Sequence, residues 1–155
     1  MRRFWLLVVA VFMVGLLPAR AVRAAGTEFV VIVNAANPIT SISRDELVRI
    51  FLKQETTWPD GQAILPVDQA ADSAVRGTFT REILRRSVGA VKSYWEKQIF
   101  SGAAVPPVEK NSNDSVESYV VVNRGAIGYV MAWALDSGKA LVKLPAGVKV
   151  LQLSE

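Results

Sequence analysis

The 155-residue sequence contains neither cysteine nor histidine. Without cysteine no disulfide can form, so the fold must be stabilised by packing alone. Without histidine, Ser-His-Asp and Cys-His mechanisms are excluded, and so are zinc and copper sites of the usual ligand types. A hydrolase would have only carboxylates such as Asp68 and Asp72, with nothing to tune their pKa values. We therefore expect no enzyme, no catalytic residue, no cofactor and no metal site.

The beginning of the chain follows the three-part plan of a secretory signal peptide. Two arginines precede an uninterrupted apolar run over residues 4–17, and a tail rich in small residues follows. The run is shorter than the roughly 20 residues of a membrane span, so an uncleaved anchor is the lesser alternative. We predict a signal peptide over residues 1–24, cleaved after Ala24 or, as second choice, after Ala21. The remaining chain, residues 25–155, would be a periplasmic domain.

The charge of the chain argues against a nucleic-acid partner. Four of the 18 basic residues and none of the 14 acidic residues lie in residues 1–24, so the mature chain carries equal numbers of both. A protein that binds nucleic acid would keep a basic excess after processing. The mature length suits one domain with its own hydrophobic core and is short for two.

Strand-like and helix-like segments alternate along the chain. We expect strands over residues 29–33, 63–67, 126–131, 140–144 and 148–153, and helices over 44–52, 74–86, 87–99 and 115–123. Ser43 and Glu46 form a capping box at the start of the first helix. Trp95 and Phe100 are expected in the core. This order predicts a single layered α/β domain with a largely parallel sheet flanked by helices.

The stretch from Pro66 to Leu84 is the candidate for binding an anion. A strand ends, a polar loop over residues 68–73 follows, and a helix begins with Asp72 or Ser73 as its N-cap. Backbone N–H groups and the positive end of the helix dipole would meet there, which suits an anion. The polar loop over residues 111–114 also precedes a helix, so the two loops could face one crevice. The alternative is an ordinary strand-to-helix connection.

Several longer stretches resemble one known family. They are VNAANPITSISRDELVRIFLKQETTWPDGQAILPVD, FTREIL, YWEKQIFSG and SYVVVNRGAIGYV, and they span about Val31 to Val130. In this order they are similar to the substrate-binding proteins of phosphate ABC transporters, which are type 2 periplasmic binding proteins. The resemblance is to a short form, and it implies a fold like one lobe of such a protein. It also implies a binding module for inorganic phosphate or a similar oxyanion, without catalytic residues.

The resemblance places the ligand at residues 68–75, where family members hold phosphate with a pattern like R-S-x-G-S-G-T. Counting back from Phe79, Ser73 falls on the hydroxyl position and Gln69 on the arginine position. Ala74 and Val75 replace Gly-Thr and would contribute backbone N–H groups, and Arg76 is a substitute cation. The alternative is that Ser73 only caps the helix and that Arg76 lies on the solvated face with its neighbouring arginines.

Full-length family members close two lobes on the ligand, whereas this chain has the length of one. A single open lobe leaves an anion more hydrated and weakens its electrostatic contacts. We therefore expect weak or absent phosphate binding by the chain alone. The second hypothesis is a protein-interaction module that binds no ligand and docks on a membrane permease or sensor. Apolar surface where the missing lobe would sit would also favour a homodimer.

Overall fold

The computed structural model describes residues 28–134, 140–141 and 143–154. The predicted signal peptide and its cleavage site lie outside these residues. The strands are β1 Glu28–Asn34, β2 Ser41–Ser43, β3 Leu65–Gln69, β4 Val108–Lys110, β5 Ala126–Ala134, β6 Ala140–Leu141, β7 Val148–Val150 and β8 Gln152–Ser154. The helices are α1 Arg44–Phe51, α2 Ala74–Glu82, α3 Val88–Phe100 and α4 Asn113–Val122. Among the described residues, no helix has the length and apolar character that a membrane crossing requires.

The main sheet has the strand order β4-β3-β5-β1-β7, with β6 paired to β5. β3 is parallel to both β4 and β5, whereas β1 is antiparallel to its two neighbours, β5 and β7. β4, β3, β5 and β7 therefore run in one direction and β1 runs against them. The expected largely parallel α/β sheet is confirmed, with β1 and the two-residue strand β6, which is antiparallel to β5, as exceptions. A separate parallel pair joins β2 to β8.

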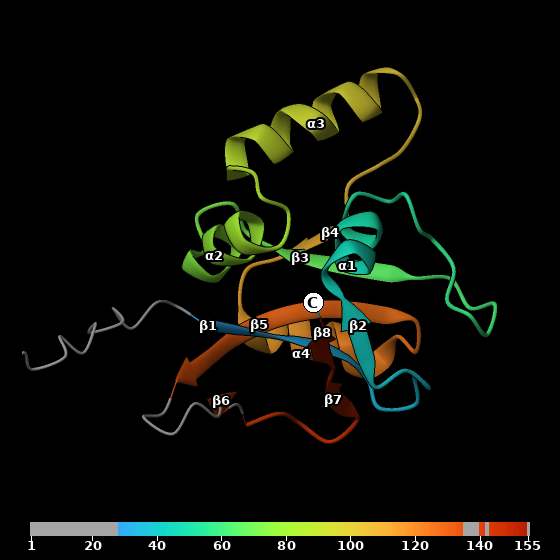
Figure 1. The fold of residues 1–155 in the computed structure, drawn as a ribbon, viewed down its shortest axis with the longest axis vertical. Coiled ribbons are helices and arrows are strands. Elements are labelled where there is room, and N and C mark those ends of the chain that lie inside the picture. The colour runs from blue at the N-terminus through green and yellow to red at the C-terminus, as the bar shows by residue number, and fades with distance from the viewer. Residues whose placement is uncertain (1–27, 135–139, 142, 155) are drawn as a thin grey trace, which may run out of the picture.

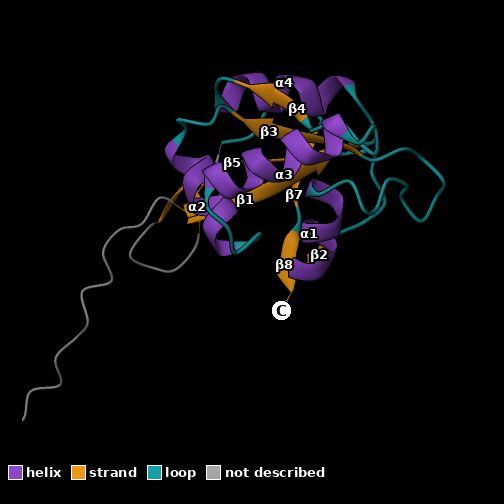
Figure 2. Ribbon diagram, turned by 90° about the horizontal axis from the view of Figure 1, so that it is seen from above, coloured by secondary structure: helices purple, strands orange, loops and turns teal. Residues whose placement is uncertain are grey.

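Helices cover both faces of the main sheet (Figures 1 and 2). On one face, residues of α1, α2 and α3 pack with Val31, Val33 and Tyr129 in the larger core cluster. On the other face, α4 packs on Ile32 and Val130 in a smaller cluster. The alternation of β1 side chains between the two clusters follows from the two-residue period of a strand. β1 is thus buried on both faces, as its continuous apolar sequence predicts.

Several predicted features of the elements are wrong. The strand predicted over residues 148–153 is two strands, β7 and β8, which lie in separate sheets, and the short strands β2 and β4 were not predicted. The helix predicted over residues 74–86 ends at Glu82. β3 begins at Leu65 and ends at Gln69, two residues later than predicted, so the first residues of the expected polar loop belong to a strand. Phe100 is 96% exposed, although Trp95 is buried as expected. At 100° per residue, Phe100 lies about 140° around the helix from Trp95 and points away from the face that packs inward.

Candidate functional site

The candidate site lies where β3 ends and α2 begins. β3 ends at Gln69, and Ser73 occupies the N-cap position of α2. Asp68 and Gln69 pair in register with Glu109 and Lys110 of the neighbouring edge strand β4. This is the carboxyl end of a parallel strand pair, the usual position of ligands in α/β sheets.

Arg76 is the cation of the site, and it is buried. Its side chain is only 9% exposed, so the alternative that it lies on the solvated face is wrong. Nη2 lies 3.0 Å from Asp68 Oδ2, and Nη1 lies 2.7 Å from Glu109 Oε2. Nη1 also donates to the backbone carbonyl of Gln69. One guanidinium therefore meets two carboxylates, which gives the group a net negative charge when both are ionised.

Asp68 is the firmly held member of the two carboxylates. Its Oδ1 accepts the hydroxyl of Tyr129 and the backbone N–H of Gln69, the latter at 2.9 Å. Burial raises the pKa of Asp68, and the Arg76 guanidinium opposes that rise. Burial likewise raises the pKa of Tyr129, so its hydroxyl keeps the proton that it donates to Asp68. These contacts fix Asp68 as part of the scaffold.

Gln69 occupies the position where the family resemblance expects an arginine, and its side chain is fully engaged. Nε2 donates to Asn113 Oδ1 at 2.9 Å and to the backbone carbonyl of Tyr129 at 3.1 Å. Oε1 accepts the hydroxyl of Ser73 at 3.0 Å. Asn113 opens α4, so Gln69 joins the two polar loops that the sequence placed near one crevice. That spatial expectation is confirmed.

Ser73 occupies the N-cap position of α2 but makes no side-chain cap hydrogen bond. By contrast, Ser43, Ser87 and Ser112 each accept a backbone N–H of the helix that they precede. In the described part of the chain, the backbone N–H groups of Ala74, Val75 and Arg76 have no acceptor. The buried Nε of Arg76 also has no partner among the described residues. Several hydrogen-bond donors therefore remain available at this helix start.

The different roles of the N-cap serines give a testable contrast in stability. Ser43→Ala removes the hydroxyl that accepts the Glu46 N–H and donates to the Glu46 carboxylate, and keeps the backbone half of the capping box. It should lower the free energy of unfolding by about 1 kcal/mol. Ser73→Ala removes no cap hydrogen bond and deletes only the bond from the Ser73 hydroxyl to Gln69 Oε1, so its cost should be smaller, about 0.5 kcal/mol. Urea denaturation followed by circular dichroism measures both. Equal costs for the two variants would contradict the assignment of Ser73.

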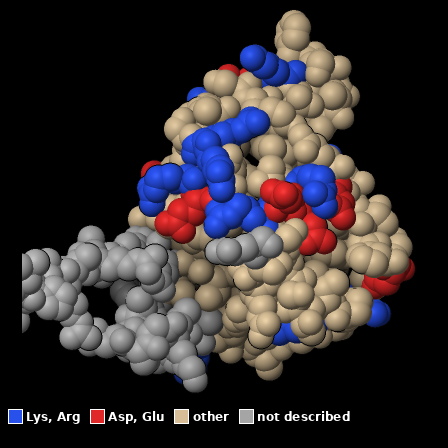
Figure 3. Space-filling model, viewed as in Figure 1, with Lys and Arg blue, Asp and Glu red and all other residues tan. Residues whose placement is uncertain are grey.

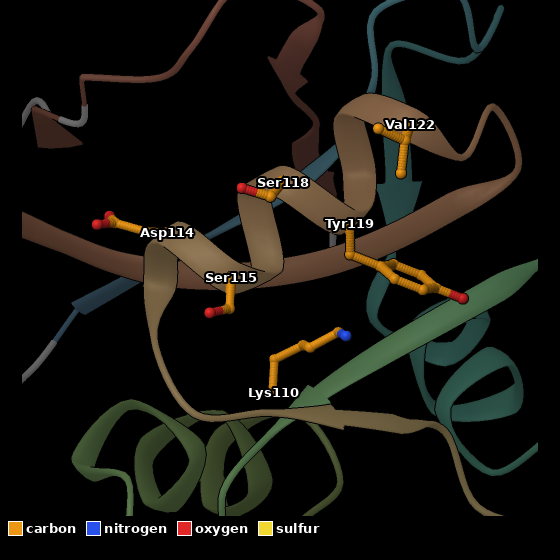
Figure 4. Close-up of a pocket in the computed structure, with 6 residues that line it drawn as sticks. All are labelled: Lys110, Asp114, Ser115, Ser118, Tyr119 and Val122. Carbon is orange, nitrogen blue, oxygen red and sulfur yellow. The ribbon is translucent and has the colours of Figure 1, made fainter.

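A separate open hollow of about 480 Å³ lies on the other side of the sheet, between β4 and α4 (Figure 4). It is lined by Lys110, Asp114, Ser115, Ser118, Tyr119 and Val122. The ammonium of Lys110 lies 5.4 Å from the centre of the Tyr119 ring. Because neighbouring residues of a strand point to opposite faces, Glu109 reaches Arg76 while Lys110 faces this hollow. None of the five residues predicted for ligand binding lines it.

The charges of the described residues do not form a metal site. No group of three or more acidic residues among them is placed to hold a metal ion. Figure 3 shows Lys and Arg side chains beside Asp and Glu side chains across the middle of one face. Side chains of opposite charge are therefore neighbours on this face. Arg76 with Asp68 and Glu109 is one such group.

The structure brings together Gln69, Ser73 and Arg76 of the predicted site, with Ala74 and Val75 at the helix start between them. It adds Glu109, Asn113 and Tyr129, which sequence reasoning did not include. Glu109 follows the Pro106-Pro107 link, and its strand VEK is only three residues long. Its pairing with β3 is a contact between residues about 40 positions apart, and no local pattern announces it.

Comparisons with known proteins agree with this geometry. A family model described as "PBP superfamily domain" matches residues 15–155. The structure is similar to an ABC-type phosphate transport receptor from Vibrio cholerae, with a TM-score of 0.59, 24% identity, and coverage of 82% of this chain and 46% of that one. It is also similar to a putative phosphate ABC transporter substrate-binding protein with bound phosphate from Clostridium perfringens, with a TM-score of 0.59, 17% identity, and coverage of 82% and 45%.

A third similar structure, PstS from Borrelia burgdorferi, has a TM-score of 0.56 and 14% identity, with coverage of 82% of this chain and 47% of that one. This chain therefore spans less than half the length of each of these proteins. At these identities the likeness shows the fold, which corresponds to one lobe. No curated protein matches the sequence.

Proposed function

Since this chain belongs to the PBP superfamily domain family, we propose that it is an exported, periplasmic lobe that binds phosphate or a similar oxyanion weakly and serves phosphate uptake. It would work as a binding module without catalysis, beside a membrane permease or sensor. The proposed ligand contacts are Ser73, Arg76, Gln69 and the N–H groups of Ala74 and Val75. Residues 1–24 would direct export and be removed.

One observation carries the proposal: the start of α2 keeps unused donors beside a buried cation. The N–H groups of residues 74–76 and the Nε of Arg76 find no acceptor among the described residues. The Nε of Arg76 is buried, and a buried donor without a partner is costly. An oxyanion would supply acceptors for this donor and for the N–H groups at the helix start. The positive end of the helix dipole adds attraction for negative charge.

The same group of residues explains why the binding should be weak. Arg76 is already paired with Asp68 and Glu109, so an arriving anion meets a net negative charge. Gln69 adds no charge where the family pattern has an arginine. The structure corresponds to one lobe, so a ligand held by this lobe alone would stay partly hydrated. We expect a dissociation constant in the millimolar range for inorganic phosphate.

A thermal-shift titration of the purified protein with phosphate tests this function. A ligand that binds only the native state raises the melting temperature as its concentration passes the dissociation constant. We expect a saturable rise with phosphate and a smaller one with sulfate, because phosphate can donate its proton to a site carboxylate. Ser73→Ala should remove the rise, since it deletes a hydroxyl at the site at little cost to stability.

Ser118→Ala is the matched control, because Ser118 lies at the hollow beside α4 and away from the proposed site. It should leave the phosphate response unchanged. Absence of any saturable shift in the wild-type protein, up to tens of millimolar phosphate, would contradict the proposal. A response lost in Ser118→Ala and kept in Ser73→Ala would move the site to the hollow.

The second candidate function is a protein-interaction module, and the end of α3 favours it. Ile99 and Phe100 are exposed there, and α3 stands away from the sheet at the edge of the molecule (Figure 1). Exposed apolar side chains grouped in this way are typical of contact surfaces. The partner would be a permease, a sensor or a second copy of the chain. A titration without any phosphate response would make this the leading function.

A further inference from the structure

Glu109 and Asp68 both contact Arg76, but they are held very differently. Asp68 is buried and has three partners: Arg76, Tyr129 and the backbone N–H of Gln69. The side chain of Glu109 is 52% exposed, and Arg76 is its one partner among the described residues. One carboxylate neutralises one guanidinium, so Asp68 alone satisfies the charge of Arg76. The second carboxylate is in excess.

The excess carboxylate carries an energetic cost within the group. Burial and, to a smaller extent, the charge of Glu109 raise the pKa of Asp68, because two negative charges share one cation. The attraction between Glu109 and Arg76 is therefore offset by repulsion from Asp68. An ion pair with one half-exposed partner is also weakened by solvent, and such pairs contribute roughly 0–1 kcal/mol. Releasing Glu109 from Arg76 should cost little.

The carboxylate of Glu109 makes the contact with Arg76 that an oxyanion ligand would make. Its Oε2 lies 2.7 Å from Nη1 of Arg76, the distance of a charge-assisted hydrogen bond to any anionic oxygen. Glu109 is the middle residue of the edge strand β4 and stands beside Asp68 in the strand register. Its side chain can leave by a change of rotamer, with the pairing of β4 to β3 intact.

We propose that Glu109 is a built-in competitor for the oxyanion site, occupying Arg76 with its own carboxylate until a ligand displaces it. This inference rests on the proposed function, because it assumes an anion site at the start of α2. It assigns the weak affinity to one side chain. The contact is autoinhibitory: the site is closed by the protein's own carboxylate and opens when that carboxylate leaves or loses its charge.

The test is phosphate titration of the Glu109→Gln variant by calorimetry and by thermal shift. Glutamine keeps the size of the side chain and removes its charge. The net negative charge of the group formed by Arg76, Asp68 and residue 109 is therefore neutralised. We expect phosphate to bind at least about tenfold more tightly than in the wild-type protein. Glu109→Asp keeps the charge on a shorter side chain with poorer reach, and it should give an intermediate gain.

Glu96→Gln is the matched control, because it changes the net charge of the protein equally on the exposed side of α3. It should leave phosphate affinity within about twofold, since exposed distant charges are screened. A wild-type protein that binds phosphate and a Glu109→Gln variant that binds no better would overturn the inference and leave the proposed function standing. No binding by either protein would overturn both. An equal gain in affinity in Glu96→Gln would show that the net charge of the protein causes the effect, and it would also overturn the inference.

Discussion

Arg76→Met should lower the free energy of unfolding by about 3–5 kcal/mol, the usual cost of removing one partner from a buried ion pair. Asp68 would stay buried without a cation, and the carbonyl of Gln69 would lose a charged donor. Methionine fills most of the same space, so the loss would come from the unpaired charge more than from a cavity. Urea denaturation followed by circular dichroism measures it.

The double variant Asp68→Asn/Arg76→Met separates the lost pair from the stranded charge. Asp68→Asn removes the buried carboxylate beside the missing guanidinium, and the remaining carboxylate of Glu109 is half exposed to solvent. At least half of the stability lost in Arg76→Met should therefore return. Single and double variants together form a cycle that gives the coupling between the two residues. A cost below about 1 kcal/mol for Arg76→Met would show that the pair is solvated and that Arg76 is not buried as described.

Phe79→Ala should also cost about 3–5 kcal/mol, because it opens a cavity in the larger core cluster. The Phe79 ring stacks on Tyr129, with ring centroids 3.9 Å apart and planes within 5° of each other. It also meets Phe51 at 4.8 Å and Phe29 at 5.3 Å. Tyr129 in turn donates to Asp68, so the same ring supports the proposed site.

Phe100→Ala is the matched control for that experiment. It removes the same atoms from a side chain that is almost completely exposed, so its cost should stay within about 0.5 kcal/mol. Urea denaturation of both variants measures the difference. Similar costs at the two positions would contradict the assignment of the core to α2 and the sheet.

Features set by neighbouring residues could be predicted from the sequence. The capping box of Ser43 and Glu46 is present as predicted, because both partners lie within one helical turn. The buried stripe of Val75, Phe79 and Ile83 follows from helical spacing. The α/β class and the order of the four helices followed from the same local patterns and were confirmed, whereas the short strands β2 and β4 were missed.

Features that depend on residues far apart in the sequence could not be predicted. Asp68 and Gln69 were expected in the polar loop over residues 68–73, and Glu109 was assigned to no element; Asp and, to a lesser degree, Glu are depleted in strands. Pairing between β3 and β4 places them in strands instead, and that pairing depends on the whole sheet. Arg76 lies one position from the buried stripe of α2, where periodicity alone does not decide its burial. The hydroxyl of Ser73 turns to Gln69 because a strand brings that acceptor close.

The place of β1 in the sheet has a consequence for when the chain can fold. β1 comes early in the sequence, yet both of its neighbours, β5 and β7, are formed by residues 126–150. β1 therefore stays unpaired until residues 126–150 have left the ribosome. Such long-range pairing slows folding. For a chain that is exported, as we propose here, late folding keeps the polypeptide extended during synthesis, in the state in which a secretion channel can thread it.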